Sequence, residues 1–452
     1  MNCTRYGIVF HLTWVLLVLF HSLGSAAQPL ITTRVSVDSS GNEGNKYSYH
    51  PSISADERYV AFDSSASNLV AGDTNDTNDI FVHDRVTRKT TRVSVDSSGS
   101  PSNGYSEYPS ISADGRYVAF HSGATNLVAN NTNGTVSDIF VHDRLNGATT
   151  LVSVDSSASQ GNQQSYYPSI SADGRYVAFQ SSASNLVTDD TNDTDDIFVH
   201  DRQDGTTSRV SVNSDGIGGN NFSNYHAISA DGQYVAFTSL ATNLVDNDNN
   251  GREDVFVHNR QDGTTSRVSV HSNGTEGDSG SYNPSISADG QYIAFESGAS
   301  NLVDSDTNGA TSDIFVHNRL TGATTIASID SSGTQGDSGS YHASISSDGQ
   351  YIAFESHASN LVASDINGSN DVFVHDRQTG KTIMASVDSS GSQGDWSSFD
   401  PSISADGQYV AFTSYTTNLV ANDTNDTEDI FVRGPDEFPW VMFLPSIIGK
   451  KR

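Results

Sequence analysis

Cysteine is almost absent from this chain, since Cys3 is the only one among 452 residues. Once the first residues are removed, neither disulfides nor thiol chemistry are available. Positive charge is scarce as well, because 23 Lys and Arg face 54 Asp and Glu, for a formal net charge of −31. Such a surface repels nucleic acid and anionic lipid at neutral pH. We therefore expect no nucleic-acid partner, and stability that comes from packing, chain closure and bound metal.

Familiar catalytic motifs are missing too. The sequence contains no G-x-S-x-G elbow, no Gly-rich phosphate loop and no Cys/His metal cluster. An active site usually breaks a repeat, and the repeats described below hardly deviate from one another. We therefore expect no enzyme activity, no catalytic residues and no organic cofactor.

A single apolar run lies near the N-terminus. It covers Val15–Phe20, follows Arg5 and precedes the small residues Gly24–Ala27. This is the layout of a secretory signal peptide over residues 1–27. An uncleaved anchor is the alternative, although the run is short for a span. The sequence predicts a secreted protein, in the periplasm or at the cell surface, with no membrane span in the mature chain.

The last stretch, residues 435–452, has a different composition from the rest. It carries Trp440, Met442 and Phe443 and ends in Lys450–Arg452. We expect an apolar and basic tail that packs as a strap against the domain. A sorting or surface-retention signal is the alternative, because the apolar part is too short for a membrane helix.

Between these ends, one unit of 58 or 59 residues recurs seven times. The chain is too long for one ordinary core, and repeats of this kind stack as small modules. The isoleucine of the Ser-Ile-Ser motif, which reads Ala-Ile-Ser in the fourth copy, marks each copy, at Ile53, Ile111, Ile170, Ile228, Ile286, Ile345 and Ile403.

Each unit contains four short β-strand patterns and no helical spacing. In the first unit they cover residues 51–55, 59–62, 79–84 and 91–96. In six of the seven units the first two patterns are joined by Asp-Gly, as at Asp114-Gly115, which is a strong hairpin signal. The fold class predicted is all-β: a seven-bladed β-propeller with four antiparallel strands per blade.

The order of the strand patterns at the two ends indicates a closed ring. The chain begins with a fourth-strand sequence at residues 33–38 and finishes with a third-strand sequence at residues 429–432. The N-terminal strand should therefore complete the last blade and cover its unpaired edge. An open solenoid, the alternative, predicts capping units. The propeller would span residues 28–434, and we expect a monomer.

The SISADGxYVAF and DIFVHDRxTGxT segments resemble the propeller repeats of the TolB-like family, a WD40-like repeat of the PD40 type. The resemblance covers residues 33–433. It implies a periplasmic scaffold or a propeller of the kind attached to some peptidases. TolB-like propellers usually have six blades, whereas this chain has seven units, and it has no room for a separate hydrolase domain.

An Asn/Asp-rich loop joins the second and third strands of each unit. The fourth loop reads DNDNNGRED, with alternating oxygen side chains, a glycine at the sixth place and a carboxylate at the ninth, a pattern that can wrap calcium. Turns held by side chain–backbone hydrogen bonds, without metal, are the alternative. The predicted calcium ligands are Asp246, Asp248, Asn250 and Asp254, with Asp73, Asn75 and Asp79, Asp190, Asn192 and Asp196, and Asp423, Asn425 and Asp429 in other loops.

A histidine recurs at one place in the third strand of six units. These are His83, His142, His200, His258, His317 and His375, and Arg433 replaces them in the seventh unit. Each belongs to a different blade, so they cannot share a metal. One structural hydrogen bond per blade is the expected role.

Aromatic residues stand near the end of the connector that precedes each Ser-Ile-Ser motif. In a propeller they would lie near the channel mouth, where they either wedge between blades or form a face that binds a ligand. The predicted ligand face comprises Tyr49, Tyr108, Tyr166, Tyr225, Tyr282, Tyr341, Trp396 and Phe399.

The sequence thus predicts a secreted binding or interaction module, stabilised by calcium, for an unidentified protein, peptide or glycan. A carbohydrate-active hydrolase or lyase that uses carboxylates of the connector face is one alternative. A structural protein of the cell surface is another. Convergent, non-repeated carboxylates at the channel mouth would favour the enzyme.

Overall fold

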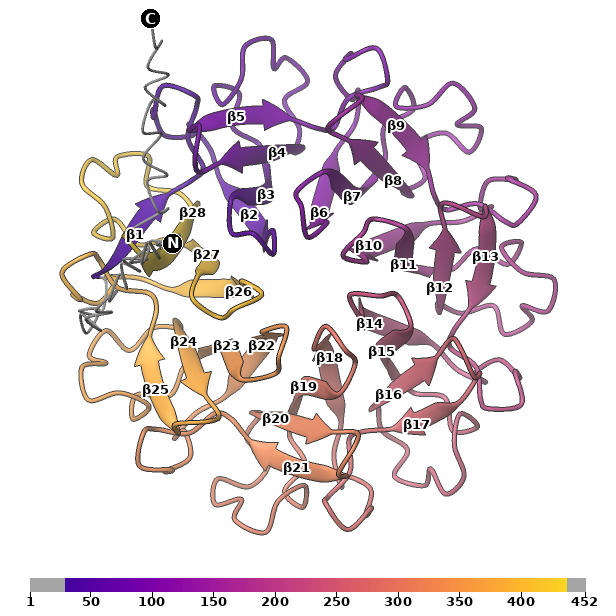
Figure 1. Cartoon of the computed structure of the whole chain (residues 1–452), viewed down its shortest axis with the longest axis vertical. Coiled ribbons are helices and arrows are strands. Elements are labelled where there is room, and N and C mark those ends of the chain that lie inside the picture. The colour runs from indigo at the N-terminus through magenta and orange to yellow at the C-terminus, as the bar shows by residue number, and fades with distance from the viewer. Residues whose placement is uncertain (1–28, 437–452) are drawn as a thin grey trace, which may run out of the picture.

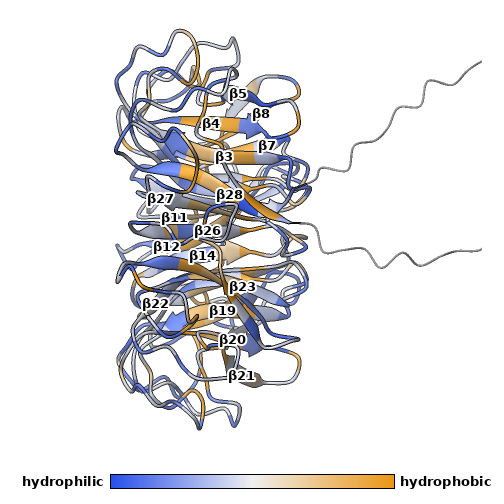
Figure 2. Cartoon of the chain, turned by 90° about the vertical axis from the view of Figure 1, so that its left-hand side faces the viewer, coloured by the Kyte–Doolittle hydropathy of each residue, from blue (hydrophilic) through white to orange (hydrophobic). Residues whose placement is uncertain are grey.

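The structure, a computed structural model, describes residues 29–436, and every regular element in that part is a β-strand. Seven four-stranded sheets stand around a central channel (Figure 1). Seen edge-on, the ring is a flat disc (Figure 2). The fold is the predicted seven-bladed propeller. Within residues 29–436 no helix is long and apolar enough to cross a membrane, and the predicted signal peptide and most of the tail lie outside the described residues.

Each blade runs outward from the channel in four antiparallel strands, and blades are numbered here in the order of the repeats. The innermost strands are β2 (Ser48–Ile53), β6 (Ser106–Ile111), β10 (Ser165–Ile170), β14 (Ser223–Ile228), β18 (Ser281–Ile286), β22 (Ser340–Ile345) and β26 (Ser398–Ile403). The second strands are β3 (Tyr59–Ser64), β7 (Tyr117–Ser122), β11 (Tyr176–Ser181), β15 (Tyr234–Ser239), β19 (Tyr292–Ser297), β23 (Tyr351–Ser356) and β27 (Val410–Ser414).

The outer half of each blade completes the sheet. The third strands are β4 (Asp79–Asp84), β8 (Asp138–Asp143), β12 (Asp196–Asp201), β16 (Asp254–Asn259), β20 (Asp313–Asn318), β24 (Asp371–Asp376) and β28 (Asp429–Pro435). The outermost strands are β5 (Lys89–Arg92), β9 (Ala148–Leu151), β13 (Thr206–Arg209), β17 (Thr265–Arg267), β21 (Ala323–Ile326), β25 (Lys381–Met384) and, in blade 7, β1 (Leu30–Arg34).

The Asp-Gly turns form as predicted, for two reasons. Gly115 has a φ of +68°, which glycine adopts without steric cost, and its Cα lies against the ring of Tyr59 in the preceding blade, where a side chain would collide. In the same turn Ser112 Oγ donates to Asp114 Oδ1 at 2.8 Å and accepts from the Tyr117 N–H at 2.9 Å. The hairpin is thus fixed from inside the blade and from its neighbour.

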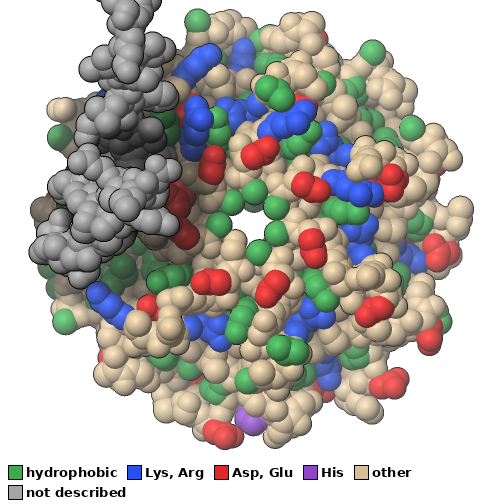
Figure 3. Space-filling view, in the orientation of Figure 1, with side chains coloured by type: hydrophobic (Ala, Val, Ile, Leu, Met, Phe, Trp, Pro, Cys, Tyr) green, Lys and Arg blue, Asp and Glu red, His purple; other side chains and the backbone are tan. Residues whose placement is uncertain are grey.

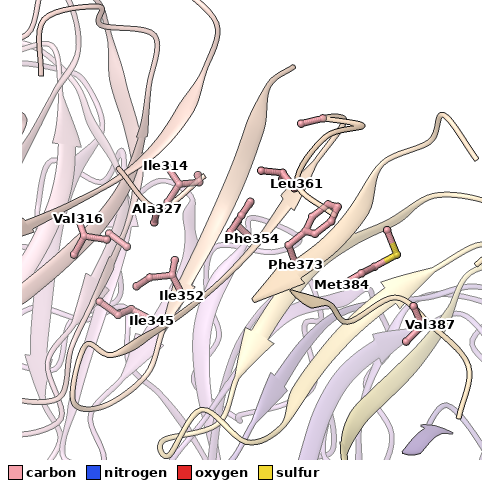
Figure 4. Packing of buried hydrophobic residues seen from close by; sticks show 12 residues of the cluster. Ile314, Val316, Ala327, Ile345, Ile352, Phe354, Leu361, Phe373, Met384 and Val387 are labelled. Carbon is pink, nitrogen blue, oxygen red and sulfur yellow. The ribbon is translucent and has the colours of Figure 1, made fainter. Parts of the chain in front are cut away.

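The hydrophobic core is divided into seven clusters, each between two consecutive blades. Figure 4 shows one of them, in which Ile314 and Val316 of blade 5 face Ile352 and Phe354 of blade 6. The second and third strands supply most of the buried side chains, which is why their sequences read as apolar runs. Each blade is therefore stabilised mainly by its two neighbours.

The N-terminal strand closes the ring, as predicted. β1 pairs antiparallel with β28, with Thr32 opposite Arg433, and completes a sheet with β26 and β27. The strand covers Leu30–Arg34 rather than residues 33–38, and its pairing extends β28 to Pro435. In the first blade the outermost strand likewise ends at Arg92, because the chain then turns inward and Val95 pairs with Pro101 in an isolated bridge.

The repeated histidines make the expected structural contact. His83 Nδ1 lies 2.9 Å from Thr90 Oγ1, and that hydroxyl donates to the Val37 carbonyl of the preceding connector. The other five histidines contact the equivalent threonines at 2.9 Å. In blade 7, Arg433 Nη1 donates to Thr32 Oγ1 at 3.0 Å, so the arginine makes the same connection.

Candidate functional site

Polar and charged side chains gather at two kinds of site: the acidic loops, and the mouth of the central channel. Each acidic loop ends in an aspartate that begins the third strand and is fully buried. In blade 1 this residue is Asp79, whose Oδ1 accepts hydrogen bonds from Ser94 Oγ at 2.5 Å and Ser102 Oγ at 2.7 Å. A carboxylate buried in this way needs a positive or donating partner on its other oxygen.

In four blades that partner is an arginine from the outermost strand. Arg92 Nη1 lies 3.1 Å from Asp79 Oδ2 and 3.3 Å from Asp73 Oδ1. Arg209, Arg267 and Arg34 make the same two contacts, at 3.1 to 3.5 Å, with the aspartates of blades 3, 4 and 7. All four guanidinium groups are almost fully buried.

In the other three blades the arginine position holds Leu151, Ile326 or Met384. A glutamine from the connector takes over there. Gln160 Nε2 donates to Asp138 Oδ2 at 2.7 Å, and the same contact measures 2.5 Å for Gln335 with Asp313 and 2.7 Å for Gln393 with Asp371. Each aspartate at the start of a third strand thus has an internal partner, which is either an arginine of the outermost strand or a glutamine of the connector.

The structure gathers most of the predicted calcium ligands around these partners. In blade 4, Asp248 and Asp254 contact Arg267, and Asn250 Nδ2 donates to Asp254 Oδ2 at 3.1 Å, whereas Asp246 is exposed. The same asparagine-to-aspartate hydrogen bond, also 3.1 Å, joins Asn75 to Asp79, Asn192 to Asp196 and Asn425 to Asp429.

Two residues of the blade 4 loop site were not predicted. They are Arg267 and Glu276, whose carboxylate lies 2.5 Å from Arg267 Nη1. One oxygen each from Asp248, Asp254 and Glu276 lies within 4.8 Å of the others, and Glu43, Asp423 and Asp429 form a similar group in blade 7. Burial, and then the charge of Asp254, raise the pKa of Asp248 to about 6. A calcium ion in either group would have to displace an arginine.

The channel mouth is shaped by a bulge in each innermost strand. The pairing of β2 with β3 shifts register between Tyr49 and Ser52, and the same irregularity recurs in the other blades. The residue three places before each Ser-Ile-Ser isoleucine adopts a positive φ of 39° to 53°. We call these seven residues the channel ring: His50, Tyr108, Tyr167, Tyr225, Asn283, His342 and Asp400.

The channel ring lines a cavity of about 610 Å³, together with the residue that follows each member. Figure 3 shows one end of the channel, a narrow opening with hydrophobic side chains at its rim, acidic side chains around them and no histidine among these, so the channel ring itself is not seen in this view. Left-handed backbone is uncommon for side chains other than glycine and asparagine, and it occurs often at binding sites.

The predicted ligand face mixed two positions of this strand. Tyr108 and Tyr225 belong to the channel ring and line its cavity. Tyr49, Tyr166, Tyr282, Tyr341 and Phe399 stand one residue earlier, where each pairs with the second strand, and Trp396 is exposed in the connector. His50, Asn283, His342 and Asp400 were not predicted, whereas Tyr167 stands beside the predicted Tyr166. The signal that could have found them is the variation of this one column among otherwise similar repeats.

One side of the channel ring is aromatic. Tyr108, Tyr167 and Tyr225, from blades 2 to 4, form what we call the tyrosine arc. The Tyr108 and Tyr167 rings meet edge to face with centroids 4.7 Å apart, and Tyr167 and Tyr225 are 6.5 Å apart. His50 stacks on Tyr108 at 3.7 Å and joins this arc to the other side of the ring.

The other side carries histidines and carboxylates, which we call the acid–histidine arc: His50, His342 and Asp400 of the channel ring, with Asp63, Glu296 and Glu355 of the second strands. His50 Nδ1 lies 2.7 Å from Asp63 Oδ1, and His342 Nδ1 lies 3.1 Å from Glu355 Oε1 and 3.9 Å from Asp400 Oδ1. Burial acts to lower the pKa of His342, but the hydrogen bond and charge of Glu355 outweigh it and raise that pKa to about 9. At neutral pH this arc therefore contains at least one ion pair.

The second-strand side chains also hold the bulges in place. The backbone N–H of Tyr108 donates to Asp63 Oδ1 at 3.2 Å, that of His342 to Glu296 Oε2 at 3.1 Å, and that of Asp400 to Glu355 Oε2 at 2.9 Å. In each case the acceptor belongs to the preceding blade. The arc is therefore fixed by contacts between blades rather than left to loop motion.

Comparison with known proteins shows the fold and leaves the activity open. No protein-family model matches the chain, and neither does any curated protein. The chain resembles the solved structure of an oligogalacturonate lyase in complex with manganese, with 13% identity, a TM-score of 0.52 and coverage of 91% of this chain and 95% of that one. It also resembles the β-propeller domain of the Trilobed protease from Pyrococcus furiosus, with 12% identity, a TM-score of 0.52 and coverage of 86% and 93%.

TolB from Acinetobacter baumannii is among the similar structures as well. The identity is 15%, the TM-score is 0.40, and the match covers 73% of this chain and 63% of that one. The structural neighbours therefore include TolB-like propellers, while membership of the PD40-type repeat family stays a prediction.

Proposed function

We propose that this propeller is an exported binding module whose ligand site is the channel mouth. The observation that carries the proposal is the pattern of variation within the repeat. The turn, core and histidine positions are nearly the same in all blades, whereas the channel ring and the second-strand residues facing it differ from blade to blade. When repeats share their structural residues and differ where they line a cavity, the cavity is the best candidate for the ligand-binding site.

The chemistry of the two arcs indicates the class of ligand. The tyrosine arc offers flat apolar faces with hydroxyl groups, which suit a sugar ring or an aromatic or aliphatic peptide side chain. The acid–histidine arc and the net charge of −31 oppose an anionic group. An uncharged glycan or a peptide that carries a cationic group fits both arcs.

The experiment is a binding screen of the purified full chain against arrays of neutral glycans and of cationic and anionic peptides. Any ligand found is then titrated against Tyr167→Asn and Tyr225→Asn, which keep a residue type that tolerates positive φ. Affinity should fall about tenfold or more in each variant. Tyr415→Asn, an exposed tyrosine outside the channel ring, is the control and should bind normally. Selective binding of anionic ligands, or equal binding by all variants, would contradict the proposal.

A carbohydrate-active lyase or hydrolase is the second candidate. Its support is the acid–histidine arc itself, because these carboxylates are not repeated in every blade, Asp400 lines the cavity, and Glu355 lies close to it beside His342. The similar fold of the oligogalacturonate lyase points in the same direction. Incubation with neutral and uronic-acid polysaccharides, followed by reducing-end and ultraviolet assays, tests it, and a lack of turnover on all of them counts against it. A structural role at the cell surface would instead place the protein in the wall fraction of cells.

Calcium binding by the acidic loops is a further part of the proposal. The carboxylate groups of blades 4 and 7 are its best supports, since each brings three acidic side chains together. Millimolar calcium should raise the melting temperature and a chelator should lower it, with a smaller response in Asp254→Asn. A melting temperature that does not move with calcium would remove this part of the proposal and leave the channel site untouched.

A further inference from the structure

Three residues of the acid–histidine arc form a compact group with the composition of a metal site. His342 Nδ1, Glu355 Oε1 and Asp400 Oδ1 all lie within 4.8 Å of one another. They come from β22, β23 and β26, so the group is built on strands of two neighbouring blades. His342 and Asp400 line the channel cavity of about 610 Å³, and the buried Glu355 contacts His342 from the second strand.

The group differs from the acidic loops in having no arginine or glutamine, because the cation within it is His342 itself, paired with Glu355 at 3.1 Å. In each loop an arginine or a glutamine contacts the buried carboxylate. Among residues 29–436 the Asp400 carboxylate accepts no hydrogen bond, and it has the charges of His342, at 3.9 Å, and of His50 near it. In the neighbouring blade 1, Asp63 Oδ2 is buried without a hydrogen-bond partner in the described part of the chain. Carboxylates therefore outnumber histidines on this side of the channel, by Asp63, Glu296, Glu355 and Asp400 against His50 and His342.

The geometry of the group is also fixed in advance. The Asp400 N–H holds Glu355 Oε2, which leaves Oε1 directed to His342, and the His342 N–H is held by Glu296. Supporting hydrogen bonds of this kind orient the ligands of metal sites and raise their affinity.

We propose that His342, Glu355 and Asp400 bind one divalent transition-metal ion, such as Zn²⁺, at the channel mouth. One imidazole nitrogen and two carboxylate oxygens are a ligand set that suits this class of metal. Three protein ligands leave coordination positions open, and these would face the cavity. Calcium and magnesium prefer oxygen ligands alone and fit the group less well. This inference goes beyond the proposed ligand binding and requires no larger ligand.

The test is calorimetric titration of the chelator-treated full chain with Zn²⁺ in the absence of any other ligand. We expect one ion per chain, and affinity about tenfold or more weaker in His342→Asn and in Asp400→Asn. Both replacements tolerate positive φ, and asparagine already occupies the equivalent position in blade 5 as Asn283. His357→Asn changes an exposed histidine of the same blade and should leave the titration unchanged.

Co²⁺ provides a second readout, because its visible spectrum reports coordination by a histidine and should change in His342→Asn. Far-ultraviolet circular dichroism verifies that each variant is folded, and Asp400→Asn keeps the test decisive if His342→Asn does not fold. No Zn²⁺ binding by the wild-type chain, or binding equally strong in both variants, would overturn the proposal. Ligand screens repeated with and without chelator separate this outcome from failure of the proposed binding function.

Discussion

At the scale of single residues, the buried aspartate of the acidic loops is stabilised by one of two different partners. A buried aspartate is paired either with an arginine of the outermost strand or with a glutamine of the connector, and the two positions change together. Arg267 stands with Glu276, whereas Leu151 stands with Gln160. Comparison of the blades therefore shows which combinations of residues at these two positions are compatible with the loop structure.

This pairing predicts the effect of exchanging the partner in blade 4. Arg267→Leu leaves Asp248, Asp254 and Glu276 facing one another and should cost about 3 kcal/mol in the free energy of unfolding. The double variant Arg267→Leu with Glu276→Gln introduces the Leu and Gln pair of blade 2 and gives the two loop aspartates a glutamine partner, as in blades 5 and 6, so it should recover most of that loss. Urea unfolding measures both. If the double variant is no more stable than the single one, the two positions do not substitute for each other.

A pH dependence of stability follows from the glutamine-paired loops. Burial raises the pKa of Asp313 and of Asp371 to about 6, above the value of about 3.9 for an aspartate in an unfolded chain. Because the folded pKa is the higher one, the stabilising effect is complete below the unfolded pKa and is lost as pH rises through about 6, at about 3 kcal/mol per group. The groups that face the two carboxyls are Ser328, Gln335, Asn308 and Asp306 for Asp313, and Ser386, Gln393, Asp365 and Asn367 for Asp371.

The measurement is the melting temperature between about pH 4 and about pH 7, which should decrease as these groups ionise. In the double variant Asp313→Asn, Asp371→Asn the decrease should be smaller, since neither side chain titrates. An equally steep decrease in the variant would show that other groups carry the effect.

At the scale of the strand and turn, the hairpin of blade 1 is the exception. Glu57 replaces the glycine of the Asp-Gly turn and adopts a φ of +63°. Burial, and then the contact with Asp406, raise its pKa to about 7. Glu57→Gly should therefore stabilise the protein by about 1 kcal/mol, because it relieves a left-handed backbone. Thermal unfolding is the measurement.

The reverse exchange provides the matched control. Gly115→Glu places a side chain in the same turn of blade 2, where the Tyr59 ring leaves no space for it, and should destabilise the protein by roughly 2 kcal/mol or more. If the two variants shift stability in the same direction, the turn conformation does not decide it.

The sequence predicted the elements better than their details. Blade number, the four strands, ring closure and the hairpins followed from the period, the alternation and the Asp-Gly turns. Outer strands were placed too late because Val93 and Val95 continue the alternation beyond the strand end, although Val93 is buried between blades 1 and 2 and Val95 lies in an isolated bridge. The bulges were missed because alternation does not reveal an added residue, and they displaced the predicted ligand face by one position. Arg267 and Glu276 are distant from their loop in sequence, so the loop pattern could not reveal them.

At the scale of the molecule, stability depends on closing the ring. Each core cluster needs two blades, and the cluster between blades 7 and 1 includes Val35, which directly follows β1. A chain that lacks residues 29–34 would expose the edge of β28 and lose Arg34 from the blade 7 loop. We expect it to melt at a much lower temperature and to associate through that edge.

Size-exclusion chromatography and thermal unfolding test this prediction. A synthetic peptide covering residues 29–38, added in excess, should restore both the monomer and much of the melting temperature. A scrambled peptide of the same composition is the control. If the shortened chain is as stable as the full one, ring closure by β1 contributes little.

The pairing of β1 with β28 also sets an order of events during synthesis. β1 leaves the ribosome before every other strand of the blades and must wait for β28, so a product that ends before β28 cannot close the ring. Until then the molecule has an open edge, of the kind that proteases and other chains recognise. Only chains that include β28 can therefore close the ring and lose this open edge, whereas chains released earlier keep it exposed.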